Sequence, residues 1–155
     1  MSKKNLGMKI IGVNKRAKRE YEILETFEAG LVLQGSEVKS LRLGRISFKD
    51  GYVRFHNEEA FLVGVHIAPY ENAGYAQHDP ERERKLLLHK REIRSLMGKV
   101  EQKGLTVIPL KVYFKNGKAK VELGLAKGKK LHDVREELKR RTIAREMARE
   151  MARFK

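Results

Sequence analysis

The sequence predicts a mainly β fold with two or three helices and a basic C-terminal tail. Three observations support this class. Several short runs alternate apolar and polar residues, as half-buried strands do. Asn116-Gly117 separates two such runs, which is the strongest short signature of a β-hairpin. Strand–helix–strand repeats are absent, and strands linked mainly by hairpins close into small barrels. We therefore expect a small OB-like closed β-barrel of about six strands.

The first part of the chain is expected to form two strands and a short helix. Residues 19–27 alternate apolar with polar side chains, and residues 31–35 form a second short run after Gly30. Ser36 is a residue type that caps helices, and Gly44 is one that ends them. We predict two strands separated by Gly30, followed by a short helix.

The middle of the chain predicts a hairpin, a long loop and a second helix. Residues 52–55 and 60–67 are strand-like runs separated by the turn HNEE. Residues 68–84 contain Pro, Gly and Asn without a period, so we expect the longest loop there, a kind of segment that is often functional. Residues 85–89 are either a strand that enters a helix ending at Gly104 or the first turn of that helix, and we favour a strand edge.

The clearest pattern lies between residues 106 and 126, where the two runs flank Asn116-Gly117. Pro109 has no N–H to donate to a ladder, which places it at an edge or a bulge. These elements complete a predicted barrel domain, 1–126, that includes a basic N-terminal arm. Residues 127–155 are expected to form a separate basic tail.

The formal net charge is +15 at pH 7, and it is unevenly distributed. Residues 21–81 carry five Lys or Arg against ten Asp or Glu, whereas the segments on both sides are basic. So strong a charge opposes compaction, and binding to a polyanion is its simplest use. Nucleic acid fits best, because phosphates are the usual partners of such surfaces. A membrane is the weaker interpretation, since no segment approaches ~18 consecutive apolar residues.

The sequence contains no recognisable catalytic or metal-binding pattern. There is no Cys, and none of the five His lies at metal-ligand spacing from another, so we expect no metal site and no cofactor. The segment GLAKGKK lacks the spacing of a phosphate-binding loop, and Lys130 stands where that loop needs Ser or Thr. We expect a binding protein rather than an enzyme. An RNA-modifying enzyme would instead depend on one of His56, His66 or His132.

A basic run precedes the first predicted strand and comprises Asn14, Lys15, Arg16, Lys18 and Arg19. It is either a solvated arm or a phosphate-binding element in which Asn14 reaches a base edge or a sugar. Glu28 and Glu37 stand near basic residues and also have two interpretations. They are surface ion-pair partners, worth at most ~1 kcal/mol each, or they orient arginines toward RNA and accept hydrogen bonds from a base.

A second basic run lies beside Leu87 and comprises Arg82, Arg84 and Lys85. Leu87 taken alone is expected in the core, although its cationic neighbours also fit an RNA-facing position. Tyr70 and Tyr75 in the long loop are candidates for stacking on bases.

The tail carries eleven Lys or Arg between residues 127 and 155. The repeat AREMAREMAR places Arg145, Arg149 and Arg153 in one row along a helix, beside a thin apolar stripe of Ala and Met. One interpretation is a solvated terminal helix or a coiled-coil arm. The other is a disordered basic tail that folds when it enters a nucleic-acid groove.

Three long stretches resemble the SmpB family of SsrA-binding proteins: NKRAKREYEILETFEAGLVLQGSEVKSLR, DPERERKLLLHKREIRSLMGKVEQKG and LAKGKKLHDVRE. The resemblance covers essentially the whole chain. It implies an OB-like barrel with a basic tail, in a bacterial protein that binds transfer-messenger RNA (tmRNA). Such a protein brings tmRNA, with elongation factor Tu, to ribosomes stalled without a usable codon. This process is trans-translation.

The resemblance also implies two sets of RNA-binding residues. The barrel set would grip the tRNA-like domain of tmRNA near its D-loop; it maps onto Asn14, Lys15, Arg16, Glu28, Glu37, Lys39 and Leu87, with Lys18, Arg19, Arg82, Arg84 and Lys85 beside them. The tail set would become helical in the decoding centre and the empty mRNA channel of the small subunit. It comprises Lys127, Gly128, Lys129, Lys130, His132, Asp133, Arg135, Lys139, Arg140 and Arg141, and His132 would stack on a decoding-centre base.

Two tail positions depart from the family pattern. Val134 stands where a Lys is usual, and Ile143 stands where many members carry an aromatic residue. Both keep the tail basic and prone to form a helix. The alternative to tmRNA delivery is an OB-type ribosomal or rRNA-binding structural protein, resident on all ribosomes. In either case we expect a cytoplasmic protein, because the opening residues lack the apolar core of a signal peptide.

Overall fold

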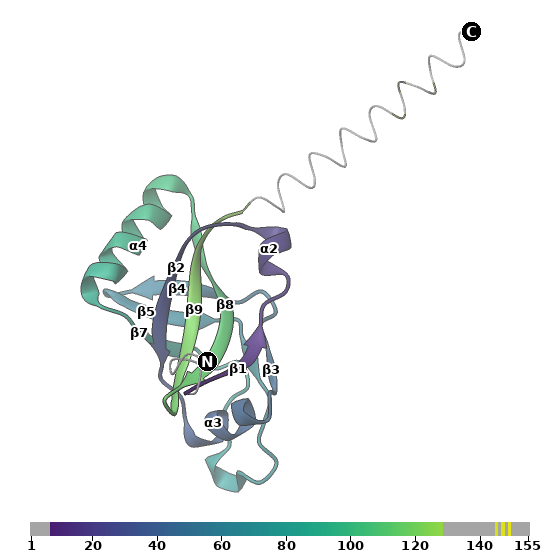
Figure 1. Cartoon of the computed structure of the whole chain (residues 1–155), viewed down its shortest axis with the longest axis vertical. Helices are drawn as coiled ribbons and strands as arrows, with labels where there is room; N and C mark the ends of the chain where they lie inside the picture. The colour runs from purple at the N-terminus through teal and green to yellow at the C-terminus, as the bar shows by residue number, and fades with distance from the viewer. Residues whose placement is uncertain (1–6, 129–144, 146, 148, 150–155) are drawn as a thin grey trace.

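The computed structural model describes residues 7–128 together with Arg145, Met147 and Arg149 (Figure 1). Strands dominate this part of the chain, which confirms the predicted mainly β class. The strands are β1 (Met8–Val13), β2 (Glu22–Leu31), β3 (Ile46–Ser47), β4 (Tyr52–His56), β5 (Glu59–Val63), β6 (His66–Ile67), β7 (Arg84–Leu87), β8 (Thr106–Lys115) and β9 (Lys118–Lys127). The α-helices are α2 (Ala17–Glu20), α3 (Gly35–Arg42) and α4 (Lys90–Lys103), and a 3₁₀ turn occupies Gly74–Ala76.

Seven strands form one antiparallel sheet in the order β1-β8-β9-β2-β7-β5-β4. β2 pairs with β9 along most of its length and with β7 at its C-terminal end. β8 and β9 form the predicted hairpin. Asn116 and Gly117 both have positive φ, 51° and 77°, as a tight turn between two twisted strands requires.

The sheet is curled but not closed. Within residues 7–128, hydrogen-bonded pairing runs from β1 to β4 and does not join these two edges. β4 lies near β8, and β1 lies near β3, so the ends of the sheet approach other strands without extending the ladder. Gly64, with φ of 80°, separates β5 from β6, which pairs with β3 in a second two-stranded sheet. The predicted closed barrel is therefore corrected to an open, curled sheet, and the predicted strand 60–67 is two strands.

Two further differences concern the N-terminal half. The predicted arm contains β1 and α2, because β1 pairs with β8, a partner about a hundred residues away in the sequence. The predicted break at Gly30 is absent, since β2 runs through Gly30, which takes a regular place in the ladder between Lys120 and Leu87. The strand predicted over residues 31–35 does not form, because β2 ends at Leu31 and α3 begins at Gly35.

α3 and α4 lie at opposite ends of the curled sheet (Figure 1). α4 begins with a capping box in which the Glu92 side chain accepts the His89 backbone N–H at 3.1 Å, and it ends at Gly104 as predicted, with φ of 63°. Its buried Ile93 and Leu96 join the core inside the sheet. Burial of such side chains contributes roughly 25 cal/mol for each Å² of apolar surface.

The N-cap of α3 lies two residues before the predicted cap, Ser36. Gln34 is the N-cap, and its backbone N–H donates to Glu37 Oε1 at 2.8 Å. Ser36 is buried instead, with its hydroxyl 2.8 Å from His78 Nδ1. Among the described helices, none is long and apolar enough to cross a membrane.

Candidate nucleic-acid interface

One face of the β8–β9–β2 part of the sheet gathers most of the candidate binding residues. Side chains alternate along a strand and cross-strand partners share a face, so the register identifies its members. We call it the lysine face; it comprises Glu28 and Gly30 of β2, Lys111, Tyr113 and Lys115 of β8, and Lys118, Lys120 and Glu122 of β9. Its four lysines lie on two adjacent strands, β8 and β9. Positive charge is therefore concentrated on one surface of the sheet.

Glu28 lies near the centre of the lysine face and is held by two donors. The buried Tyr113 hydroxyl donates to Glu28 Oε2, and Lys115 Nζ lies 3.5 Å from the same oxygen. The Tyr113 hydrogen bond is the largest influence on the pKa of Glu28; together with Lys115 and Lys120 it outweighs desolvation and lowers that pKa. Burial and the Glu28 carboxylate raise the pKa of Tyr113. Glu28 is thus an ionised, oriented carboxylate that remains partly exposed.

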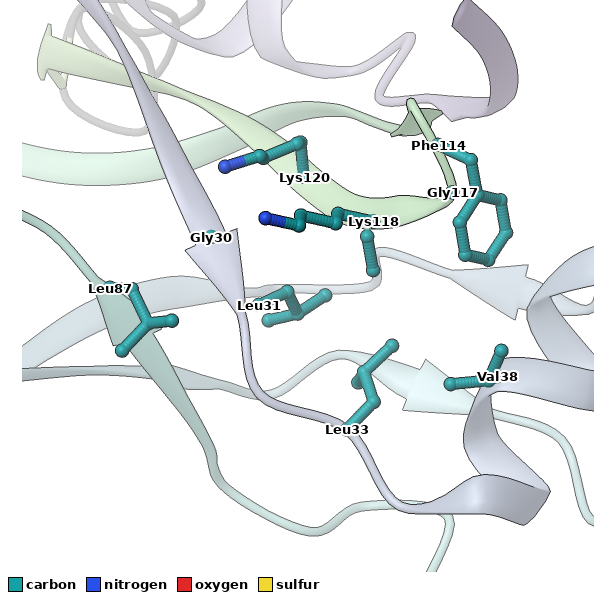
Figure 2. A pocket seen from close by; sticks show the side chains of 10 residues that line it. Gly30, Leu31, Leu33, Val38, Leu87, Phe114, Gly117, Lys118 and Lys120 are labelled. Atoms are coloured by element: carbon teal, nitrogen blue, oxygen red, sulfur yellow. The ribbon is translucent and has the colours of Figure 1, made fainter. Parts of the chain in front are cut away.

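Leu87 projects from β7 beside this face. Leu87 is 57% exposed, so the expectation from the residue type alone, a core position, is wrong. It borders a hollow of about 290 Å³ whose other apolar walls include Leu33, Val38 and Phe114. Figure 2 shows Leu87 on one side of the hollow and Lys118 and Lys120 extending over Gly30 from β9.

Asn14 connects the end of β1 to the irregular segment of β8. Its side-chain Nδ2 donates to the Pro109 carbonyl at 2.9 Å, and its backbone N–H donates to the Leu110 carbonyl at 2.7 Å. The ladder register shifts between Pro109 and Lys111, which confirms the predicted edge or bulge position of Pro109. The structure therefore uses the Asn14 amide to fix the backbone that leads into α2. Asn14 also borders a second hollow of about 410 Å³.

The basic run is ordered around α2 and is not a free arm. Ala17 is buried and anchors the helix, which leaves Lys15, Lys18 and Arg19 exposed. Arg16 is exposed too, but its Nη2 lies 2.9 Å from Glu20 Oε1 in an i,i+4 ion pair. Lys15, Lys18 and Arg19 form no ion pair within residues 7–128, and Lys18 also borders the second hollow.

Glu37, Arg82 and Arg84 form a separate cluster under α3. Arg84 Nε donates to Glu37 Oε2 at 2.6 Å, and Arg82 Nη2 donates to Glu37 Oε1 at 2.5 Å. Arg84 Nη1 also donates to the Val65 carbonyl at 2.6 Å. Burial by itself would raise the pKa of Glu37, but hydrogen bonds from Arg82, the Gln34 backbone and Arg84 outweigh it and lower that pKa.

This burial concerns two of the predicted RNA-binding residues, Glu37 and Arg84. The side chains of Glu37 and Arg84 have no exposed surface, so neither reaches a phosphate in this conformation. Arg82 keeps 29% of its side chain exposed and is held by Glu37. The interpretation in which Glu37 orients arginines agrees with this geometry, whereas direct contact by Glu37 or Arg84 does not.

The remaining predicted residues of the folded part lie outside the hollow. Lys85 is exposed on β7 and pairs with Glu59 at 3.1 Å. Lys39 of α3 lies over the Tyr70 ring, 5.5 Å from its centroid. Tyr75 is fully exposed in the long loop. Of the tail set, Lys127 ends β9 opposite Glu22 and Gly128 follows it; Lys129, Lys130, His132, Asp133, Arg135, Lys139, Arg140 and Arg141 lie outside the described residues.

Sequence reasoning did not find the contribution of the β8–β9 hairpin. Lys111, Tyr113, Lys115, Lys118 and Lys120 were not predicted as site residues, although the structure places them together. The signal was present in KVYFKNGKAK, because alternation on both sides of the turn puts these side chains on one face. Only the pairing with β2 shows that this is also the face of Glu28.

Comparisons with known proteins identify the family of the chain. The family model of the SmpB protein matches residues 11–153. An SsrA-binding protein of Solidesulfovibrio magneticus is 66% identical over 153 residues, 99% of each chain. An SsrA-binding protein of Thermosynechococcus vestitus is 60% identical over 146 residues, 93% of this chain and 95% of the relative. A solved structure described as "tmRNA-SmpB: a journey to the center of the bacterial ribosome" is 59% identical with a TM-score of 0.65, and the match covers 77% of this chain and 85% of that one. The chain belongs to the SmpB family.

Proposed function

We propose that this protein binds the tRNA-like domain of tmRNA through its lysine face and delivers it to stalled ribosomes in trans-translation. Family membership supports the proposal, since the relatives are SsrA-binding proteins and the solved neighbour concerns tmRNA, SmpB and the bacterial ribosome. The observation that carries it is the gathering of four lysines around an oriented carboxylate, Glu28, and an exposed leucine, Leu87.

This combination fits an RNA loop better than a regular duplex. Lysines bind phosphates without reading sequence, whereas a carboxylate and an apolar surface act on bases that have left a stack. Glu28 can accept hydrogen bonds from base amino groups because its lowered pKa keeps it ionised. Phosphate contacts then supply affinity, and Glu28 with Leu87 supplies selectivity for a loop that exposes its bases.

Glu37 and Arg84 take a supporting part in this proposal. Their buried ion pair fixes α3 to the first residue of β7, the strand that also carries Lys85 and Leu87. Asn14 supports the interface in the same way by tying α2 to β8. These residues act by positioning the side chains that contact RNA.

The proposal assigns different tasks to the two parts of the chain. The OB-like curled sheet within 1–126 would select tmRNA, and the basic tail 127–155 would enter the mRNA channel and decoding centre of the small subunit. Elongation factor Tu would contribute through aminoacylated tmRNA. The role is one of binding without catalysis, in the cytoplasm.

Competition binding of the full chain tests the proposed function. We expect the tRNA-like domain of tmRNA to displace a labelled copy of itself at a much lower concentration than an ordinary tRNA does. Ribosome sedimentation is the second arm, and the protein is expected on ribosomes stalled at a message end in preference to elongating ones. Equal residence on both kinds of ribosome would favour the structural-protein alternative.

A further inference from the structure

The long loop between β6 and β7 displays one aromatic side chain that the lysine face does not include. Tyr75 has the largest exposed fraction among the exposed large hydrophobic side chains of the described residues, and it lies in the 3₁₀ turn Gly74–Ala76. The segment around it, 72–77, carries no charge and no other large apolar side chain. The ring therefore projects alone into solvent, with both of its faces accessible.

Two serines of α3 hold the two ends of this loop. Ser36 and Ser40 lie one helical turn apart, and both are buried. The Ser40 hydroxyl donates to the Ala68 carbonyl at 2.6 Å, where the loop begins. The Ser36 hydroxyl lies 2.8 Å from Nδ1 of the buried His78, near the other end of the loop. His78 Nε2 donates to the Ile67 carbonyl at 2.9 Å, so this ring also ties the end of the loop back to its beginning.

The side chain of Gln77 closes the interior of the loop. Its Nε2 donates to the Tyr70 carbonyl at 2.7 Å, and its Oε1 accepts the Tyr70 backbone N–H at 3.0 Å. Between these two residues, the N–H groups of Ala73 and Ala76 donate to the carbonyls of Tyr70 and Ala73. The segment that carries Tyr75 is thus braced, and a braced aromatic side chain loses little conformational entropy when it binds.

α3 separates this loop from the hollow beside the lysine face. Val38 lines that hollow, and Arg42, one turn further on, lies over the ring of Phe114 in its wall. Ser36 and Ser40 are each two positions from Val38, which is about 200° around a helix of ~3.6 residues per turn. The loop therefore packs against the side of α3 that faces away from the hollow. Its partner is distinct from the RNA segment that the lysine face holds.

We propose that Tyr75 stacks on an unpaired base of ribosomal RNA when the protein delivers tmRNA. Every base has a flat π surface, and a tyrosine with open faces matches it without reading the sequence. The side of the protein turned away from bound tmRNA is free to meet the ribosome, the second RNA partner in the proposed function. The inference rests on that function and adds a ribosomal contact made by the folded part of the chain.

The surroundings of Tyr75 favour an RNA base over a protein surface. The residues that dominate protein interfaces lie within well-packed pockets, surrounded by contacts that exclude water. Tyr75 has only small or uncharged polar neighbours in the loop, so it offers a single ring and no apolar patch around it. A single ring is sufficient for stacking on a base.

Three substitutions at one position test the contact. Because Tyr75 is fully exposed, none of them is expected to change the free energy of unfolding. Each full-length variant is loaded with tmRNA, and its Kd for ribosomes stalled at a message end is measured. Tyr75→Phe keeps the ring and is expected to bind like the wild type, whereas Tyr75→Ala and Tyr75→Leu are expected to weaken binding about fivefold or more.

Two further measurements distinguish ribosomal RNA from tmRNA as the source of the base. All three variants are expected to bind the isolated tRNA-like domain with wild-type affinity, because the loop faces away from the hollow. Chemical probing of the ribosomal bases then locates the contact. One unpaired base is expected to be protected by the wild type and by Tyr75→Phe, and to stay reactive with Tyr75→Ala.

Gln77→Ala tests the brace separately from the ring. It removes both hydrogen bonds to Tyr70 and is expected to weaken ribosome binding less than Tyr75→Ala does. In the Tyr75→Ala background it is expected to cause no further loss, because the brace acts through the ring. Gln102→Ala, at an exposed glutamine of α4, is the matched control and is expected to bind like the wild type. Equal losses from Gln77→Ala in both backgrounds would overturn the bracing role.

The inference is overturned if Tyr75→Ala binds stalled ribosomes as the wild type does. It is equally overturned if Tyr75→Leu matches the wild type, as an apolar protein contact would predict, or if Tyr75→Ala weakens binding of the isolated tRNA-like domain instead. In each of these cases, a wild-type preference for tmRNA and for stalled ribosomes leaves the proposed function standing. A wild-type protein without that preference would refute the proposed function itself.

Discussion

The carboxylate of Glu37 and the guanidinium of Arg84 meet at 2.6 Å, and neither side chain has any exposed surface. Charges are rarely buried so completely, and this pair is satisfied by further partners. Arg82 and the Gln34 backbone N–H also donate hydrogen bonds to the Glu37 carboxylate. Arg84 donates further hydrogen bonds to the carbonyls of Val65 and Pro80. The pair joins α3 to β7 across 47 positions of sequence and so fixes the strand that carries Leu87.

Glu37→Gln is expected to destabilise the fold strongly. The substitution keeps the shape of the side chain but leaves the buried Arg84 without its counter-charge, which costs on the order of 3 kcal/mol or more. Urea unfolding measures the change in the free energy of unfolding. Glu59→Gln, which breaks the exposed pair with Lys85, is the control and is expected to change it by less than about 1 kcal/mol. Equal effects of both substitutions would contradict a stabilising role for the buried pair.

The stability of the protein is expected to fall in acid, with Glu37 contributing to the loss. Because its folded pKa is lowered from 4.5, its contribution is complete above that unfolded value and disappears as the pH falls through the folded pKa. The free energy of unfolding, measured by urea at several pH values from neutral downward, is expected to decrease below about pH 4.5. The decrease is expected to be shallower in Glu37→Gln, and identical slopes would refute this assignment.

Tyr113→Phe is expected to raise the pKa of Glu28. The Tyr113 hydroxyl makes the hydrogen bond that contributes most to the lowered pKa of this carboxylate. Titration of the Glu28 carboxyl carbon by NMR follows the change directly. Tyr52→Phe, an exposed position on β4, is the matched control and is expected to leave Glu28 unchanged. An unaltered Glu28 titration in Tyr113→Phe would show that the tyrosine does not hold the carboxylate.

Leu87→Ala is expected to weaken tmRNA binding about tenfold, a loss of ~1.4 kcal/mol, while the free energy of unfolding changes little. More than half of the Leu87 side chain is exposed, so truncation removes few core contacts. Leu43→Ala is a closely matched control, because Leu43 is also 57% exposed but lies after α3, away from the hollow. Similar losses of affinity in the two variants would argue against a specific contact at Leu87.

The elements that the sequence predicts well are those whose signals are local. The β8–β9 hairpin follows from Asn116-Gly117 and two alternating runs, and the end of α4 follows from Gly104. β1 was missed because its ladder depends on β8, far along the chain. Gly30 was interpreted as a strand break, since a sequence does not show whether a glycine ends a strand or opens one of its faces.

The site residues divide in the same way. Glu28 and Leu87 were identified through the family resemblance, and the structure places both beside the lysine face. Glu37 and Arg84 were expected at the RNA surface, but their burial depends on a pairing between distant segments that residue types do not reveal. The alternation of the hairpin lysines is visible in the sequence and indicates that they share a face. Only the strand register places Lys120 beside Gly30 and Lys118 opposite Lys115.

The central claim is tested most directly by a comparison of two chains, the full chain and one that ends after Gly128. For each chain, the affinity for tmRNA and for an ordinary tRNA is measured at two salt concentrations. Gly128 is the appropriate end because β9 continues to Lys127, which pairs with Glu22. Both chains are expected to prefer tmRNA strongly, and affinity is expected to fall with salt with a log–log slope of about −5 for some six phosphates. Failure of the shorter chain to discriminate, or a slope near zero, would contradict the claim that the lysine face selects tmRNA.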